Sequence, residues 1–567
     1  SSMVPVCFFL PLSETKISQF VFPSSAALVA MACDDYLNTP PMDRLSSDNF
    51  YQTPAQSEQG VMGIYTDLRN LSDNEFWYLS ELRSDNLWVQ TQPDGYREWS
   101  ELNTFRAAYD LPMFNTVWNR WYKLIYDANI ALTKIPSCDF GNRESYKNQL
   151  LGEVYFLRGW AYFELARLFA NIPIIDIPMS PNEAANVPQS TVRDVYDKII
   201  LPDLREAKKL LPVADDMIDI RNQKISGTRA DKVAAQAMLG RVYMTMSGFP
   251  LNDTSAQSLA EVELKAVIDY SEANANKYWA PDSTEWKKQW MAEYNNKYSI
   301  FAIQYRSGGT GNPSITSTGL MVPPSYTAIN FVSTNRGFIW IEKSLRHEFD
   351  KVYENNRRDA RGEGQSILSG YDAEPNAGAT WATPYPVQTD TIHLSDGSVQ
   401  NVKINSMLYK YVNSKHRRAE LGLTGDIETE MKDAGDWPVN YAVIRLEDVL
   451  LMYAEILVSK NDINGAMNIV NRIRTRMGCD AETAKDATHA MELIKRERRI
   501  EFLGEGIRWF DMIRWNEWQS KHRLRINRYN NPAGTDLNYF RDARYLCPIP
   551  MSQLDVKPGF YKQNEGY

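Results

Sequence analysis

The chain contains few of the residues that build metal or redox sites. It has five cysteines and five histidines among 567 residues, no CxxC pair occurs, and the histidines lie far apart. Zinc sites need Cys and His ligands at short, regular spacings, so no metal site is predicted. Outside the first 33 residues only Cys138, Cys479 and Cys547 remain. They allow at most one intrachain disulfide, and their spacing does not identify the partners.

Known catalytic and cofactor motifs are also missing. The sequence has no His-Glu-x-x-His motif, no phosphate-binding Gly-Lys-Ser/Thr loop and no Gly-x-Ser-x-Gly elbow. The glycine pairs Gly362/Gly364 and Gly504/Gly506 lack the third glycine that a dinucleotide-binding turn requires. We therefore predict neither catalytic residues nor a cofactor.

Long apolar runs and blocks of positive charge are absent as well. No run reaches the roughly 20 apolar residues of a transmembrane helix. The net charge of -9 is spread along the chain, and no Lys/Arg block alternates with aromatic residues. A nucleic-acid partner is therefore not expected.

The first 33 residues differ from the rest. Apolar residues at 20–22 and 26–32 precede Cys33, and the run ends in small residues. Its length is typical of the apolar part of a signal peptide. We predict that residues 1–32 are a signal peptide and that Cys33 is lipidated after cleavage. The alternative is a buried apolar segment with an ordinary cysteine.

Helical periodicity dominates from about residue 54 to residue 246. Segment 149–169 should form a buried helix that ends before Pro173, because proline lacks the N–H needed for the helix ladder. Segment 229–247 carries small residues such as Gly240, which favour close helix packing. The apolar seam of segment 149–169 consists of Leu150, Val154, Leu157, Ala161, Leu165 and Leu168. Further helices are predicted at 112–135, 190–211 and 256–275.

The amino-acid composition changes between residues 279 and 440, where Gly, Ser, Thr, Pro and aromatic residues predominate. Asp396-Gly397 interrupts the alternating run 392–404 and predicts a two-residue hairpin turn. Helical patterns return at 441–458, 463–476 and 490–518. We predict a mainly α fold, a tetratricopeptide-like array of helical hairpins with inserted loops and short β-hairpins. Its regions are 33–278, 279–440 and 441–567.

Charged residues in segment 496–515 alternate in sign. Glu497, Glu501 and Glu505 interleave with Arg498, Arg499 and Arg508. We predict ion pairs along one helix, because charges three or four positions apart lie on the same helical face. An acid and base pair is the alternative.

Several ordered segments resemble one family. They are CDDYL (33–37), GEVYFLRGWAYFELARLFANIPII (152–175), YAVIRLEDVLLMYAEIL (441–457), NIVNRIRTR (468–476), RERRIEFLGEGIRWFDMIRW (496–515) and the closing YLCPIPMSQLDVKPGFYKQNEGY. Together they resemble the SusD/RagB family of outer-membrane lipoproteins of Bacteroidetes.

The resemblance implies a lipid-anchored protein on the extracellular face of the outer membrane. Such a protein is expected to capture a glycan, without cleaving it, and to deliver it to a SusC-like TonB-dependent transporter. Two alternatives stay open: a peptide-capturing, RagB-like lipoprotein, and a helical glycoside hydrolase, which would need a suitable pair of carboxylates.

Aromatic residues outside amphipathic helices are the ligand-site candidates. Sugar rings have apolar faces and a rim of hydroxyl groups, so they suit aromatic platforms with Asp, Asn or Arg partners. Trp88 and Trp99 are the first candidates. The others are Asp85, Asn86, Tyr96, Arg97, Trp279, Trp286, Trp290, Trp340 and Trp381. The spacing of Trp279, Trp286 and Trp290 also fits one face of a helix, so core packing is the alternative there.

Overall fold

The computed structural model describes residues 50–71, 78–89, 97–225, 227–291, 297–305, 339–369, 387–411, 415–424, 439–528 and 544–567. The predicted signal peptide and Cys33 lie outside the described residues. Residues 51–567 form one compact unit.

Helix α6 (Glu144–Phe169) confirms the prediction of a long buried helix. All six apolar residues of the predicted seam have no solvent-exposed surface. The helix ends four residues before Pro173, which then pairs in the short strand β2 (Ile172–Pro173). Because its apolar residues face several directions, α6 is enclosed on most sides by other helices.

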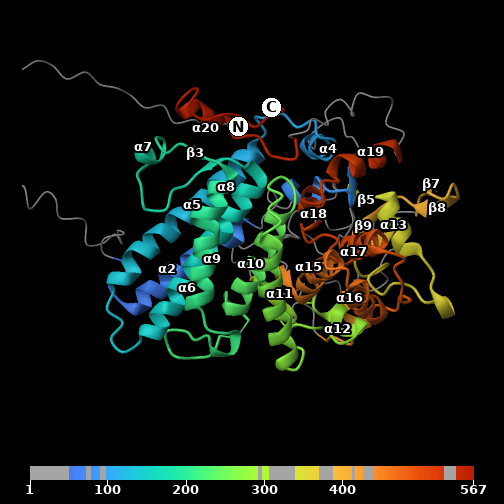
Figure 1. Cartoon of the computed structure of the whole chain (residues 1–567), viewed down its shortest axis with the longest axis horizontal. Coiled ribbons are helices and arrows are strands. Elements are labelled where there is room, and N and C mark those ends of the chain that lie inside the picture. Colours follow the sequence, from blue (N-terminus) through green and yellow to red (C-terminus); the bar gives the residue numbers. More distant parts are fainter. Residues whose placement is uncertain are drawn as a thin grey trace, which may run out of the picture. The chain divides into compact units, whose positions relative to one another are not determined.

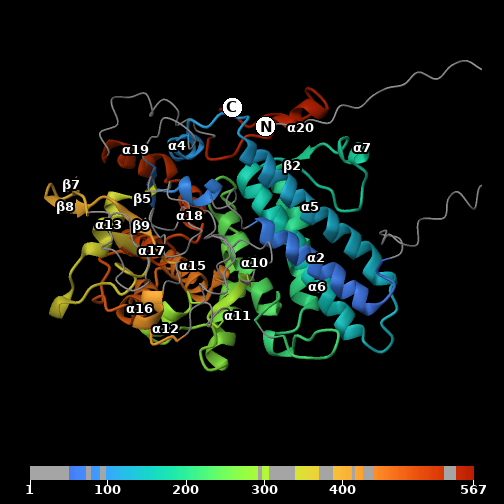
Figure 2. The ribbon, with the colours of Figure 1, turned by 180° about the vertical axis from the view of Figure 1, so that it is seen from behind.

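The amino-terminal helices form a continuous array in which each helix packs against the next. Figures 1 and 2 show this array running from α2 to α11. Its members, besides α6, are α2 (Pro54–Leu71), α5 (Pro112–Lys134), α9 (Leu201–Leu210), α10 (Lys232–Ser247) and α11 (Ala256–Ala273). The predicted array of helical hairpins is thus confirmed.

Glycines set the close spacing between neighbouring helices of the array. A Cβ atom on Gly240 of α10 would lie 2.5 Å from a methyl carbon of Leu264 on α11. A Cβ atom on Gly159 of α6 would lie 3.0 Å from Leu204 of α9. These distances leave no room for a side chain, which confirms the predicted close packing of segment 229–247.

The carboxy-terminal helices pack onto α11. Helix α15 (Leu446–Ser459) contacts α11, and α16 (Ile463–Arg476) and α17 (Ala487–Glu501) pack on α15 around a shared apolar core.

Two predicted helix boundaries in this region need correction. The predicted helix from residue 441 begins at Leu446, because residues 441–445 form strand β10 paired with β4 (Ser299–Ile303). The predicted helix 490–518 breaks after Glu501.

The break after Glu501 has a local cause. Gly504 and Gly506 have φ angles of 81° and 70°, which lie in the left-handed region that glycine adopts without strain. The chain turns here and resumes as α18 (Arg508–Arg514) and α19 (Trp518–Arg528). The two glycines therefore form a turn between helices.

The inserted region contains short strands, as predicted. Strands β7 (Thr389–His393) and β8 (Val399–Lys403) form a hairpin, and β6 (Ile367–Ser369) pairs with β9 (Ser406–Leu408). Strand β5 (Ile339–Ile341) pairs with β1 (Leu87–Val89) of the amino-terminal region. The short helices are α4 (Arg97–Asn103), α7 (Pro181–Ala184), α8 (Val192–Val195), α12 (Ser283–Lys288), α13 (Lys343–Asp350), α14 (Lys415–Glu420) and α20 (Met551–Val556).

The turn between β7 and β8 differs from the prediction. The Leu394 N–H donates to the carbonyl of Ser398 at 2.9 Å, so three residues, 395–397, close the hairpin instead of two. Gly397 has a φ of 84°. This matches a three-residue loop whose last position is left-handed.

The three described cysteines are buried and free, so Cys138 and Cys479 do not form a disulfide. Among the residues that the structure describes, no helix combines the length and the apolar character needed to cross a bilayer.

The close contact at Gly240 gives a first prediction. Gly240→Ala should lower the free energy of unfolding by about 1–3 kcal/mol, because the new methyl group forces Leu264 and α11 away. Urea denaturation measures this. Gly63→Ala is the matched control, since a Cβ atom at Gly63 of α2 would have no neighbouring atom within 4 Å. Gly63→Ala should raise the free energy of unfolding by up to about 1 kcal/mol, because alanine favours a helix more than glycine does. An unchanged stability of Gly240→Ala would contradict the packing argument.

Asp231 gives a second prediction. Its buried carboxylate accepts a hydrogen bond from Ala234 N–H at 2.8 Å and caps α10. Burial raises its pKa from 3.8 to about 7, so the folded state keeps a proton that the unfolded chain releases. The folded protein should therefore lose roughly 4 kcal/mol of stability from this group as the pH rises from 4 to 8.

Asp231→Asn keeps the hydrogen-bond acceptor and removes the ionisation. Relative to the unmodified protein, this variant should gain stability between pH 5 and pH 8 in urea denaturation. Asp486→Asn is the control, because Asp486 is an exposed cap of α17. If the stability of Asp231→Asn and of the unmodified protein changed with pH in the same way, the raised pKa of Asp231 would be contradicted.

Candidate functional site

Two of the predicted tryptophans lie opposite each other in a small sheet. Trp88 of β1 pairs with Trp340 of β5 across the antiparallel ladder. Since side chains alternate along a strand, both rings face the same side of the sheet, and the buried neighbours on each strand face the other. Trp340 is 7% exposed, whereas Trp88 is only partly buried. Trp88 thus keeps an aromatic surface in contact with solvent.

Neighbouring side chains hold the two tryptophans in place. Trp88 and Trp340 form one apolar cluster with Met407 of β9 and Leu368 of β6. The guanidinium carbon of Arg525 lies 5.7 Å from the centroid of the Trp88 ring, within the range of a cation–π contact. Arg525 also donates to the carbonyls of Ser84, Leu87 and Asn103, so it joins α19 to the start of β1 and to the end of α4. The ring is held in place before any ligand arrives.

Asp85 lies next to this sheet but points into the protein. Its two carboxylate oxygens accept hydrogen bonds from Arg508 at 2.7 and 3.0 Å, and Arg499 lies 3.5 Å away. Burial by itself would raise its pKa, but Arg499 and Arg508 outweigh burial and hold the pKa well below the usual range. In this structure Asp85 binds α17 and α18.

Asn86 has a similar position. It has no exposed surface, and its amide donates to Glu81 at 2.8 Å. Glu81 in turn accepts the backbone N–H groups of Gly504 and Gly506 at 3.1 and 3.0 Å. The segment before β1 therefore holds the turn between α17 and α18.

The other predicted aromatic residues mostly lie in the interior. Trp99 of α4 is 7% exposed and packs on Tyr78, with ring centroids 5.7 Å apart. Trp286 is fully buried and donates to Glu501 at 2.8 Å. Trp290 is 1% exposed and lies edge-on to Trp286 at 5.9 Å. All three residues are therefore buried in this structure.

Trp279 is partly exposed but lies between two cations. Its ring is 4.2 Å from the guanidinium carbon of Arg472 and 4.0 Å from that of Arg476. Tyr96, Trp381 and the side chain of Arg97 lie outside the described residues. Of the predicted site residues, the structure thus brings together Trp88 and Trp340. Asp85 and Asn86 hold the segment that precedes Trp88 in the chain.

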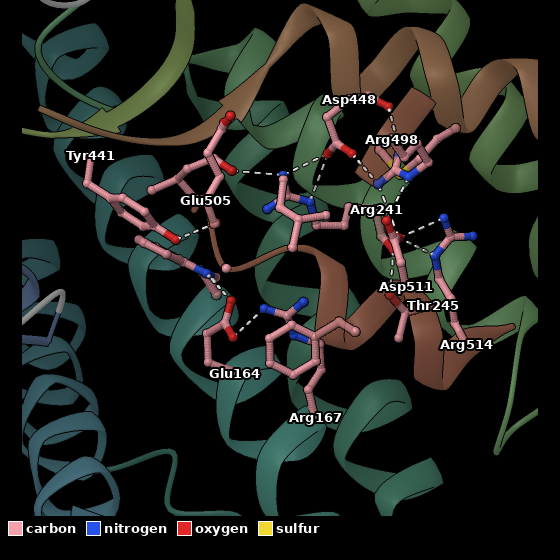
Figure 3. Close-up of a pocket in the computed structure, with 16 residues that line it drawn as sticks. Glu164, Arg167, Arg241, Thr245, Tyr441, Asp448, Arg498, Glu505, Asp511 and Arg514 are labelled. Atoms are coloured by element: carbon pink, nitrogen blue, oxygen red, sulfur yellow. Dashed lines mark hydrogen bonds and ion pairs between the residues drawn. The ribbon is translucent and has the colours of Figure 1, made fainter. Parts of the chain in front are cut away.

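Figure 3 shows a buried cavity where α6, α10, α15 and α18 meet, lined by four carboxylates and four arginines. Asp448 accepts hydrogen bonds from Arg241 and Arg498, each at 2.7 Å. Asp511 accepts from Arg498 at 2.7 Å and from Arg514 at 2.9 Å. The cavity volume of about 40 Å³ has room for only a few water molecules. No substrate fits there.

The charged residues of segment 496–515 do form ion pairs, but across elements. Glu501 is bonded to Arg361 at 2.8 Å and to Arg445 at 2.9 Å, and Arg498 binds Asp448 of α15. The predicted pairing along one helix was wrong: α17 ends at Glu501, and even the residues within α17, such as Arg498 and Glu501, pair with residues of other elements. Burial alone would raise the pKa of Glu501, yet Arg445 and Arg361 lower it. A general acid needs a raised pKa, so Glu501 lacks this property.

A second aromatic surface was not predicted from the sequence. Trp118, Tyr122 and Tyr126 follow one another at intervals of four residues along α5 and line a groove of about 920 Å³ with the carboxy-terminal tail. The four-residue spacing was the available signal, but a stripe of this kind is usually buried in the core. Only the tertiary structure shows that part of it faces a groove.

Comparison with known proteins identifies the family. The family model described as "SusD family" matches residues 286–567, and the one described as "Starch-binding associating with outer membrane" matches residues 35–244. SusD-like protein P38 of Formosa agariphila is 24% identical over 517 residues, which cover 86% of this chain and 89% of that protein. The chain belongs to the SusD/RagB family.

Solved structures share the fold. A SusD homolog from Bacteroides thetaiotaomicron superposes with a TM-score of 0.73 at 20% identity, covering 92% of this chain and 99% of that one. A structure described as a laminarin-binding SusD-like protein gives a TM-score of 0.64 at 22% identity, covering 91% and 100%. These similarities confirm the mainly α, SusD-like fold.

The position of Asp85 gives a third prediction. Asp85→Asn removes the charge between Arg499 and Arg508 and should lower the free energy of unfolding by about 3–5 kcal/mol, because the buried guanidinium group of Arg508 loses the carboxylate with which it pairs. Thermal and urea denaturation test this. Asp269→Asn, which breaks the exposed 2.7 Å pair with Lys265, should change stability by less than about 1 kcal/mol. If Asp85→Asn changed ligand binding at unchanged stability, Asp85 would be a ligand residue.

Proposed function

We propose that this protein captures a glycan on the outer surface of the cell and passes it to a TonB-dependent transporter of the SusC type. The observation that carries the proposal is Trp88, a partly exposed aromatic residue that packs against Trp340 and Met407 and lies within cation–π distance of Arg525. A rigid aromatic platform stacks on the apolar face of a sugar ring with little loss of conformational freedom.

The family supports this proposal. One matching family model is described as starch-binding and associated with the outer membrane, and one structural neighbour is described as laminarin-binding. Both descriptions concern glycans. Lipid attachment at Cys33, extracellular exposure and delivery to the transporter are the parts of the proposal that come from the family resemblance and from the apolar run before Cys33.

We propose binding without cleavage. Glycoside hydrolysis requires two carboxylates beside the ligand, one of them with a raised pKa. The carboxylates that support the Trp sheet, such as Asp85, and those of the cavity in Figure 3 are neutralised by arginines in the interior. They hold helices together and are not presented to a ligand.

Trp88→Ala gives the fourth prediction. If a sugar stacks on Trp88, losing the ring should weaken glycan binding by about tenfold to a hundredfold, since one stacked aromatic ring is worth roughly 1–3 kcal/mol. The measurement is a glycan array followed by isothermal titration calorimetry with the strongest ligand, using the chain that starts after Cys33. Incubation should produce no new reducing ends.

Trp279→Ala is the matched control. Trp279 is also partly exposed, but Arg472 and Arg476 cover it, so its loss should leave glycan binding unchanged. An unchanged affinity and an unchanged number of binding sites in Trp88→Ala would place the site away from the Trp sheet. Binding to a peptide array but to no glycan would support the RagB-like alternative, and sustained hydrolysis would contradict a pure binding role.

A further inference from the structure

A groove between α5 and the carboxy-terminal tail has the properties of a ligand site. Its volume is about 920 Å³, at the upper end of the roughly 300–1,000 Å³ typical of small-molecule sites. α7 and α20 border it, and they lie close to α5 in both views (Figures 1 and 2). Tyr122 and Tyr126 contribute rings to one wall, beside Trp118, which is only 3% exposed, and Phe560 and Tyr561 contribute rings to another.

The walls of the groove are fixed in position. The Tyr122 hydroxyl donates to the carbonyl of Pro173 at 2.8 Å, and the Tyr561 hydroxyl donates to the carbonyl of Val187 at 3.0 Å. Phe560 and Tyr561 stack with ring centroids 5.5 Å apart. Because both phenol groups are bonded to the backbone, the ring orientations are set in advance, which reduces the entropy lost on binding.

The last residues of the chain hold the second wall in place. The Asn564 amide donates to the carbonyls of Phe169 at 3.0 Å and Cys547 at 2.8 Å. Gln563 exchanges two hydrogen bonds with the backbone of Ile549, at 2.7 and 3.0 Å. The terminal Gln-Asn-x-Gly-Tyr motif therefore fastens the tail onto α6 and places Phe560 and Tyr561 beside the groove.

The polar groups of the groove indicate which ligand it accepts. Asn119, Asn182 and Gln553 contribute amides, and Lys557 is the one charged residue among the described residues that line the groove. Amides donate and accept hydrogen bonds, as sugar hydroxyl groups do. Tyr126 is 45% exposed, so part of its ring is available for stacking. Most of the remaining lining is aliphatic, namely Ile125, Pro173, Ile175, Pro178, Met179, Pro181, Ala184, Ala185 and Val556. Aromatic and aliphatic walls with a few neutral amides suit an uncharged ligand that presents apolar faces, as a neutral sugar does.

The geometry points to a second subsite, for a short neutral oligosaccharide, in the groove between α5 and the carboxy-terminal tail. It is separate from the Trp88 sheet, with which it shares no lining residue. The inference rests on the proposed function, because it assumes that glycans are the natural ligands. A chain with two sites for the same polymer binds it more tightly through effective concentration.

The test uses isothermal titration calorimetry with maltoheptaose and laminarihexaose, which are neutral chains of α- and β-linked glucose. Trp88→Ala should retain binding at one site. Adding Tyr126→Ala to that variant should weaken the remaining binding by at least about tenfold. Adding Tyr109→Ala instead should leave it unchanged, because Tyr109 is 46% exposed but does not line the groove.

Each outcome distinguishes the two proposals. If Trp88→Ala abolishes all binding, the groove is no subsite, and the proposed function stands. If the Trp88→Ala/Tyr126→Ala variant binds as tightly as Trp88→Ala alone, the groove is likewise excluded. Binding of neither probe to any form overturns the subsite, and the proposed function is then decided by the glycan array.

Discussion

Two buried carboxylates, one at the end of α17 and one in the turn that follows it, join the inserted region to the carboxy-terminal helices. Glu501 is paired with Arg361 and Arg445, and Glu505 with Lys410 and Arg445. All five side chains are at most 1% exposed, and an unpaired charge in such a place costs several kcal/mol. Because Arg361 and Lys410 belong to the inserted region and Arg445 ends β10, these pairs fasten the inserted region to α15 and α17.

The ligand-site candidates depend on the same turn. Glu81 binds the N–H groups of Gly504 and Gly506, and Asp85 binds Arg508. These contacts fix the segment that leads into β1 and so fix Trp88. In this part of the molecule, charged groups in the interior join the helices, whereas Trp88 remains partly exposed.

The sequence identified the aromatic residues but not their surroundings. Trp88 and Trp340 were both candidates, and strand pairing places them opposite each other. Trp286 and Trp290 have helical spacing and lie in the core, as the alternative interpretation held. Asp85 and Asn86 were expected beside a ligand, but their partners are arginines and a glutamate, and the arginines lie far away in the chain. No local pattern reveals such partners, because they meet only when the chain folds.

The sequence by itself determined the helices, their buried faces and the family. Helix periodicity and proline act over a few residues, so α5, α6, α10, α11 and α16 appear close to their predicted limits. Only the tertiary structure decided where α17 ends, which carboxylate meets which arginine, and that Tyr126 lines a groove closed by the tail. These features depend on contacts between distant segments, where burial strengthens every charge pair and the packing of neighbours determines which ring stays exposed.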